Sequence, residues 1–306
     1  MQIPVAFQEK IKNAFGEAGK VWLESLETRI QTYLTKWQLT AIGPVDNLSY
    51  NYVLRVADSE DSLFILKLGV PHFDIQNEIY TIQAYDGDGC AKLLKADEEN
   101  GVMLLEQLSP GTMLSEVKDE SLVLQYYVKV WQSLRRPASD YKEAPLVRDW
   151  FNGLQRYRKA YKNGNGPISN HDIDLAEQCF QYVTETSAGT ELLHGDLHHE
   201  NILFSQEHGW TAIDPKGVLG DPYFDLISFL LNYLHTKDNP KELLQFRVNV
   251  ISEQLALDRQ RLLKAAIAMA TLSACWSIEE QEPSWEKTYQ CVKWFHEFLT
   301  ESGPLT

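Results

Sequence analysis

The chain has few cysteines, and none of them belongs to a motif. The four cysteines of this 306-residue sequence, Cys90, Cys179, Cys275 and Cys291, are widely spaced and include no C-x-x-C pair. A disulfide framework or a zinc ribbon requires closely spaced cysteines, so the sequence predicts neither. We therefore expect reduced thiols and a cytoplasmic protein.

The chain also lacks an apolar leader and a long hydrophobic run. Charged and polar side chains occupy residues 1–20, where a signal peptide would carry its apolar region. The longest apolar stretch, residues 262–278, contains Lys264 and is shorter than the about 20 residues that cross a bilayer. We interpret this stretch as a buried helix and expect no membrane partner.

Basic residues are in the minority. The sequence has 28 lysines and arginines against 43 aspartates and glutamates, a formal net charge of -15. Nucleic-acid binding needs a basic surface, so we expect no nucleic-acid partner. The acidic charge favours a cationic small-molecule substrate, but it is equally typical of proteins that are acidic for solubility alone.

Two neighbouring segments have the composition of a phosphoryl-transfer centre. Residues 193–204 read LHGDLHHENILF, and residues 210–217 read WTAIDPKG. Phosphoryl transfer needs a carboxylate beside the acceptor hydroxyl and oxygen ligands that hold Mg²⁺ on the phosphates. Asp196 is the candidate for the carboxylate, and Asn201 and Asp214 are the candidate metal ligands.

The spacing of these residues supports the assignment. Residues 201–204 and 210–213 are predicted strands joined by a polar turn, and such a hairpin would return Asn201 and Asp214 to the same end. Alone, an Asp or Asn in a loop is usually a turn or cap residue. The order and spacing of all three residues together favour the functional interpretation.

The histidines of this region are weaker candidates for metal ligands than Asn201 and Asp214. A zinc site at His194, His198 and His199 would need a further ligand at a matching spacing, and none is evident. We expect His194 to brace the loop by hydrogen bonds. Asp225, at the start of a helix predicted over residues 225–235, is expected to accept backbone donors.

These segments resemble the catalytic and metal-binding loops of the protein kinase-like superfamily. His-Gly-Asp replaces the His-Arg-Asp of protein kinases and Ile-Asp-Pro replaces Asp-Phe-Gly, the form typical of aminoglycoside phosphotransferases. Residues 213–222, together with residues 85–94 and 105–112, resemble more specifically the streptomycin 6-kinase-like branch of aminoglycoside/hydroxyurea resistance kinases. The likeness extends from about residue 43 to about residue 232.

The resemblance implies an α+β fold with two lobes. One lobe is a small antiparallel β-sheet that binds nucleotide, and the other is mostly helical and carries the catalytic loop and acceptor site. We expect two helices with a break at residues 16–19 in the segment 1–38, the nucleotide lobe at 39–108 and the helical lobe at 109–306. Strands are predicted at 49–56, 63–68, 90–96 and 102–108, and helices at 119–134, 145–161, 172–186, 223–235, 240–255, 258–278 and 283–300.

A lysine in an apolar strand marks the nucleotide site. Lys67 stands in the predicted strand 63–68, where its charge would be costly without a partner. The superfamily places here the lysine that holds the phosphates of the nucleotide. Glu78 of the following helix is the expected ion-pair partner, although a glutamate at such a place can also be a solvated helix residue.

The remaining nucleotide contacts are predicted by position. The loop at residues 43–49 has no G-x-G-x-x-G motif, which departs from the kinase pattern, and we expect Ser49 to cover the triphosphate. Glu106 and Leu108 would meet the adenine edge through their backbone groups. The resemblance implies ATP and Mg²⁺ as cofactors.

A cationic acceptor would need acidic and aromatic side chains in the second lobe. The charge run at residues 279–282 is also typical of a solvated helix end, so both interpretations stay open. The candidate acceptor residues are Glu200, Asp221, Trp276, Glu279, Glu280 and Glu282.

The sequence thus predicts an ATP- and Mg²⁺-dependent O-phosphotransferase. The expected acceptor is a hydroxyl of an aminoglycoside such as streptomycin, which would make the protein an antibiotic resistance kinase. One alternative is a metabolic kinase of the same superfamily that acts on choline, a sugar or an amino alcohol. Another, kept open by the glycine-poor loop, is a nucleotide-binding regulator with weak catalysis. The sequence does not predict an oligomeric state.

Overall fold

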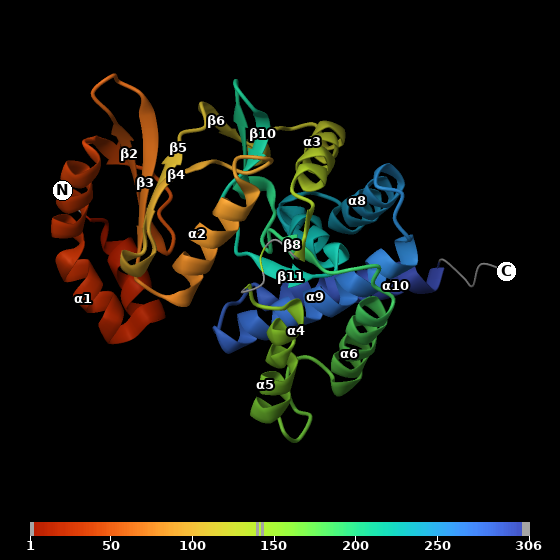
Figure 1. Cartoon of the computed structure of the whole chain (residues 1–306). Coiled ribbons are helices and arrows are strands. Elements are labelled where there is room, and N and C mark those ends of the chain that lie inside the picture. Colours follow the sequence, from red (N-terminus) through yellow and green to blue (C-terminus); the bar gives the residue numbers. More distant parts are fainter. Residues whose placement is uncertain (1–2, 139–140, 142–143, 302–306) are drawn as a thin grey trace. The chain divides into compact units, whose positions relative to one another are not determined.

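The computed structural model describes residues 3–138, 141 and 144–301 (Figure 1). The chain divides into two compact units. The first unit consists of Met1–Thr112 and Leu203–Lys216, and the second of Met113–Ile202 and Gly217–Thr306. The first unit therefore includes a segment that follows the His-Gly-Asp motif in the sequence.

A five-stranded antiparallel sheet forms the centre of the first unit. Its strand order is β1-β2-β3-β5-β4, in which every neighbouring pair is antiparallel. The β4–β5 hairpin turns through Gly101, which follows Asn100 and has a φ of 64°. The strands are β1 (Thr40–Pro44), β2 (Asn51–Ala57), β3 (Leu63–Gly69), β4 (Leu93–Asp97) and β5 (Val102–Glu106).

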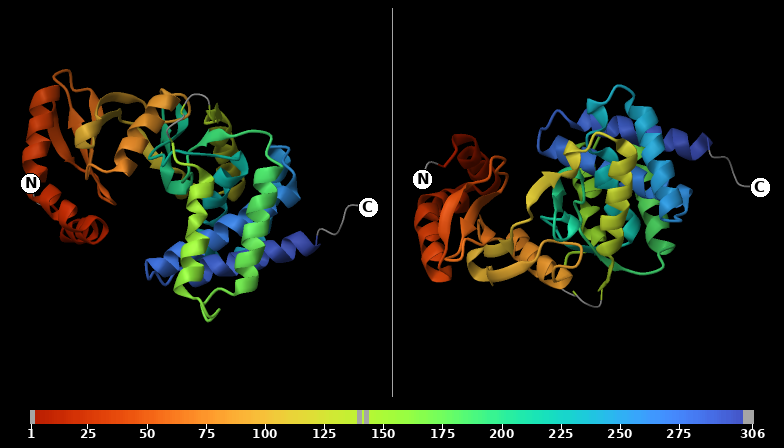
Figure 2. Two further views of the ribbon diagram at one scale, coloured as in Figure 1. Left: turned by 60° about the horizontal axis from the view of Figure 1, so that its bottom comes forward. Right: turned by 90° about the horizontal axis from the view of Figure 1, so that it is seen from above.

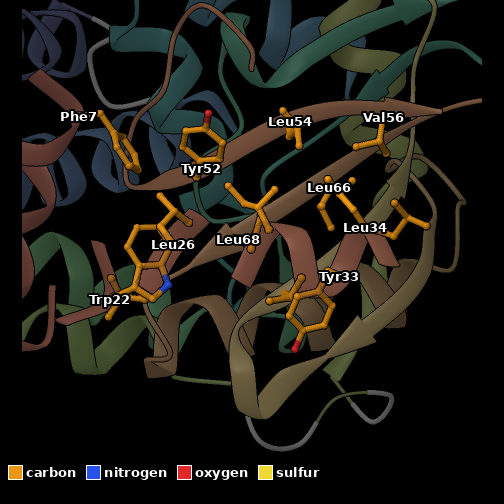
Figure 3. Close-up of a cluster of buried hydrophobic side chains, with 14 of the residues drawn as sticks. Phe7, Trp22, Leu26, Tyr33, Leu34, Tyr52, Leu54, Val56, Leu66 and Leu68 are labelled. Atoms are coloured by element: carbon orange, nitrogen blue, oxygen red, sulfur yellow. The ribbon is translucent and has the colours of Figure 1, made fainter. Parts of the chain in front are cut away.

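The long helix α1 (Val5–Trp37) covers one face of this sheet (Figure 2). It is broken at Gly16, whose φ of 54° and ψ of -127° are not helical, which confirms the break predicted from the sequence. Because side chains alternate along a strand, every second residue of β2 and β3 faces α1. Figure 3 shows this core, to which α1 contributes Phe7, Trp22, Leu26, Tyr33 and Leu34, and the strands contribute Tyr52, Leu54, Val56, Leu66 and Leu68.

The intervening residues of β3 meet helix α2 (Phe73–Tyr85), since Lys67 is bonded to Glu78 of that helix. A second sheet has the order β10-β9-β6, with β6 (Pro110–Met113), β9 (Ile202–Ser205) and β10 (Gly209–Ala212). Since β9 and β10 are hydrogen-bonded neighbours in this sheet, the predicted hairpin is confirmed. Its end is fixed because Ala212 N–H donates to the Gly89 carbonyl and the Ala212 carbonyl accepts from Ala91, both at 2.9 Å.

The second unit is built around helix α9 (Arg259–Glu279), which lies beside α10 (Figure 2). By length and composition α9 could cross a membrane, but most of its residues are buried inside the unit, as expected for a core helix. A small sheet contains β7 (Arg136–Pro137), β8 (Glu191–Leu193) and β11 (Val218–Gly220). The other helices are α3 (Glu120–Ser133), α4 (Val147–Trp150), α5 (Asn152–Ala160), α6 (Asn170–Glu185), α7 (Ile227–Leu231), α8 (Pro240–Gln254) and α10 (Trp285–Glu301).

Two predicted helices are wrong in extent. The helix expected over residues 223–235 is divided into two short 3₁₀ turns and the five-residue α7. Tyr233 interrupts it with a φ of 57°, in the left-handed region that a continuous α-helix cannot contain. The helix expected over residues 145–161 is divided into α4 and α5.

Candidate active site

The candidate nucleotide-binding residues of the first unit lie around Lys67. The Lys67 ammonium lies 2.5 Å from Glu78 Oε1 and 3.0 Å from Asp214 Oδ1. Burial alone would lower the pKa of Lys67, but the charges of Asp214 and Glu78 raise it, so the side chain stays protonated. Lys67 is only 3% exposed, and the ion pair expected with Glu78 is present.

Asp214 is held in an unusual backbone conformation. Its φ is 57°, in the left-handed region, and its side chain is 47% exposed although one oxygen contacts Lys67. The loop that follows is tied to α2, because the side-chain amide of Asn77 donates to the Lys216 carbonyl. Asn77 is not marked by any sequence pattern, since a polar residue on a helix gives no sign of a distant backbone partner.

The candidate catalytic residue of the second unit, Asp196, lies in the loop at residues 194–201. Asp225 Oδ1 accepts the Gly195 N–H at 2.7 Å, and its Oδ2 accepts the His194 N–H at 3.3 Å. His194 Nδ1 in turn accepts the Asp196 N–H at 3.2 Å. The expected bracing roles of His194 and Asp225 therefore agree with their contacts, and the loop that presents Asp196 is fixed by buried groups.

The side chain of Asn201 is oriented by the same loop. Its Nδ2 donates to the Asp196 carbonyl at 2.9 Å, and in the described part of the chain no hydrogen bond is made to its amide oxygen. That oxygen is therefore available as a ligand. An amide oxygen and the partly exposed Asp214 carboxylate are donors that Mg²⁺ prefers, and Mg²⁺ usually takes its other ligands from phosphates and water. Each of these two side chains thus offers an oxygen whose chemistry fits this ion.

His198 also belongs to this loop, and its contacts there were not predicted from the sequence. Its Nδ1 accepts the Glu200 N–H at 3.3 Å. Nε2 lies 3.3 Å from Asn201 Nδ2 and 3.8 Å from Asp196 Oδ1. The only available signal was its position between Asp196 and Asn201 in the sequence.

The predicted adenine contacts fall at the end of β5. The Glu106 N–H donates to the Lys92 carbonyl at 3.1 Å, so this N–H is not available to a base. The Glu106 side chain accepts the Lys92 N–H at 2.6 Å and lies 2.9 Å from His208 Nε2 in the turn between β9 and β10. Leu108 is buried, and Ser49 lies on the loop before β2, where its hydroxyl is 3.4 Å from the Lys10 ammonium.

The acceptor candidates separate into structural and available residues. Asp221 is buried, and its two oxygens accept from Arg261 at 3.1 and 2.5 Å. This contradicts the expectation that Asp221 faces a substrate, because its charge is already compensated inside the fold. Glu279 pairs with Arg156 at 2.9 Å, and Trp276 packs edge to face with Trp150.

The other acceptor candidates are exposed. Glu280 and Glu282 lie at the turn after α9, and Glu200 lies in the catalytic loop, where its side chain is 45% exposed. The Tyr233 hydroxyl donates to Glu200 Oε1 at 2.8 Å, and Tyr233 itself is 36% exposed. Glu200 and Tyr233 therefore form an acidic and aromatic pair beside the loop of Asp196.

The sheet unit with its buried lysine and the helical unit with its His-Gly-Asp loop define a protein kinase-like fold, and the chain is a phosphotransferase that acts on hydroxyl groups of small molecules. It belongs to the aminoglycoside/hydroxyurea antibiotic resistance kinase family, whose sequence profile matches residues 36–281. The predictions of fold and family are therefore confirmed. The relation to kinases also implies ATP as the phosphoryl donor.

Curated relatives and a solved structure agree with this family. The chain is 28% identical to a hydroxyurea phosphotransferase of Kitasatospora aureofaciens, over 92% of this chain and 82% of that protein. It is 26% identical to a streptomycin 6-kinase of Streptomyces griseus, over 92% of each. The structure of a choline kinase from Streptococcus pneumoniae aligns with a TM-score of 0.62 at 15% identity, over 89% of this chain and 99% of that one.

Proposed function

We propose that the protein transfers the γ-phosphate of ATP, with Mg²⁺, to a hydroxyl of an aminoglycoside, with streptomycin as the first candidate. The observation that carries this proposal is the loop of Asp196. The bonds from Asp225 and His194 hold the backbone around Asp196, and Asn201 is bonded to the same residue. Such a loop presents a carboxylate in a fixed place, as transfer to a hydroxyl requires.

The residues of the chain act in the following roles. Asp196 orients the acceptor hydroxyl and takes its proton while the hydroxyl oxygen bonds to the γ-phosphorus and the bond to the ADP oxygen breaks. Lys67, held charged between Glu78 and Asp214, binds phosphate oxygens of the nucleotide. Asn201 and Asp214 would hold Mg²⁺ through their side-chain oxygens, and the ion would supply positive charge to neutralise the phosphates.

The acceptor class follows from charge and from the relatives. The net charge of -15 and the exposed pair of Glu200 and Tyr233 suit a cationic acceptor, since a carboxylate and an aromatic face both attract cations. A relative that covers 92% of the chain is a streptomycin 6-kinase. Hydroxyurea is the second candidate because a relative at 28% identity is a hydroxyurea phosphotransferase.

The test is Mg²⁺-dependent ADP release from ATP with streptomycin, other aminoglycosides, hydroxyurea and choline as acceptors. Streptomycin should stimulate release, and added salt should raise its KM because exposed charge pairs are screened. Stimulation by hydroxyurea alone would replace the acceptor but keep the phosphotransfer. Stimulation by none of these acceptors would contradict the proposed acceptor class.

A further inference from the structure

The loop that carries Asp214 is held at both ends. Before Asp214, the end of β10 is fixed by the two hydrogen bonds of Ala212 to Gly89 and Ala91. After Asp214, the Lys216 carbonyl accepts the side-chain amide of Asn77. All of these residues belong to the first unit.

The backbone of Asp214 needs such support. Its φ of 57° places a residue with a side chain in a region that is sparsely populated without glycine. A conformation of this kind persists only where neighbouring contacts fix the chain on both sides. On the side after Asp214, the bond from Asn77 is such a contact two residues away.

Asn77 is well placed to be rigid. Its side chain is 3% exposed, and it stands on α2 directly before Glu78, which binds Lys67. One helix therefore holds the lysine through Glu78 and the loop of Asp214 through Asn77. Lys67 in turn contacts Asp214 Oδ1 at 3.0 Å.

We propose that Asn77 is a positioning residue that holds the Asp214 carboxylate in its metal-binding orientation by tying Lys216 to α2. This inference rests on the proposed function, because it takes Asp214 as a ligand of Mg²⁺. A residue that only stabilised the first unit would affect every form of the nucleotide alike. A residue that orients Asp214 affects the nucleotide with metal more than the nucleotide without it.

The test compares binding of a non-hydrolysable ATP analogue by calorimetry, once with Mg²⁺ and once with a chelator. Asn77→Ala should weaken binding with Mg²⁺ by about tenfold, the effect of one buried hydrogen bond, and leave binding without metal nearly unchanged. Gln76→Ala is the matched control, because Gln76 also donates its side-chain amide to a backbone carbonyl, that of Glu98, from the same helix. Gln76→Ala should change neither affinity.

A second measurement, hydrogen exchange, keeps the proposal testable if Asn77→Ala destabilises the whole protein. Hydrogen exchange should become faster in residues 213–217 of Asn77→Ser, which is too short to reach Lys216, while exchange in β2 and β3 stays as in the parent protein. Equal losses with and without Mg²⁺, or unchanged exchange in residues 213–217, would overturn the role of Asn77.

Asp214→Asn separates this inference from the proposed function. If Asp214→Asn weakens metal-dependent binding and Asn77→Ala does not, only the inference fails. If Asp214→Asn has no effect either, Asp214 is not a metal ligand and the proposed function fails at that residue.

Discussion

The side-chain amide of Asn201 donates to the backbone carbonyl of Asp196 at 2.9 Å. This bond joins the candidate metal ligand to the candidate catalytic residue within one loop. It also engages the nitrogen end of the amide, which leaves the oxygen end for a ligand.

Replacing Asn201 should therefore change the metal requirement. Asn201→Ala removes the oxygen ligand and the bond to Asp196, and we expect roughly a tenfold or larger loss of apparent Mg²⁺ affinity. The measurement is the rate of ADP release over a range of Mg²⁺ concentrations at saturating ATP. An unchanged Mg²⁺ dependence would contradict the assignment of Asn201.

The buried ion pair of Lys67 and Glu78 should be required for activity, whereas an apolar pair could replace it without a large loss of stability. Lys67→Met removes the ammonium from the phosphates and should lower kcat/KM for ATP by roughly 10²- to 10³-fold. It also leaves Glu78 buried without a charged partner, which should cost about 3 kcal/mol of unfolding free energy.

The double variant Lys67→Met with Glu78→Leu separates these two effects. It replaces the pair with apolar side chains and should regain much of the lost stability in urea unfolding, while activity stays low. Recovery of activity in the double variant would contradict the role of Lys67.

Asp221 should affect stability and not the choice of acceptor. Asp221→Asn weakens its buried pair with Arg261 and should lower the unfolding free energy by about 3 kcal/mol. The ratio of kcat/KM between two aminoglycosides should stay the same, measured well below the melting temperature. A changed ratio would return Asp221 to the acceptor site.

His199 should make stability depend on pH. Burial, together with the positive charge of Arg247, lowers the pKa of His199 to about 2, so the folded protein keeps this ring neutral. The unfolded chain takes up a proton near pH 6.5, and the stability due to His199 is therefore present above that pH and is lost as the pH falls.

The size of this effect can be measured against a variant. The difference in unfolding free energy between the parent protein and His199→Gln should decrease by about 1.4 kcal/mol for each unit of pH below 6.5. Urea unfolding between pH 7.5 and pH 5 gives this slope. A difference that does not vary with pH would show that His199 is not held neutral.

The sequence predicts those parts of the site that depend on local pattern. A single lysine in an apolar strand indicates a buried charge, and the following helix offers Glu78 within one turn of its apolar face. The break at Gly16 is also local, because a glycine interrupts the helical spacing. These predictions succeeded because the physical reason lies within a few residues of the feature.

The parts that could not be predicted depend on distant partners. Arg261 is 40 residues from Asp221, and only the fold brings its guanidinium to that carboxylate. Glu106 Oε2 lies 2.9 Å from Nε2 of His208, which is 102 residues away in the sequence. Neither partner is marked by a sequence pattern, since an isolated arginine or histidine is compatible with many positions.

Asp196 is the residue on which the account of catalysis depends most. The most direct test is ADP release with streptomycin and Mg²⁺, compared between the parent protein and Asp196→Ala, with nucleotide affinity measured for both. We predict a decrease of kcat by roughly 10²- to 10⁴-fold, about 3 to 5 kcal/mol of barrier, with nucleotide affinity nearly unchanged. An Asp196→Ala protein that retains the acceptor-stimulated rate would contradict the account.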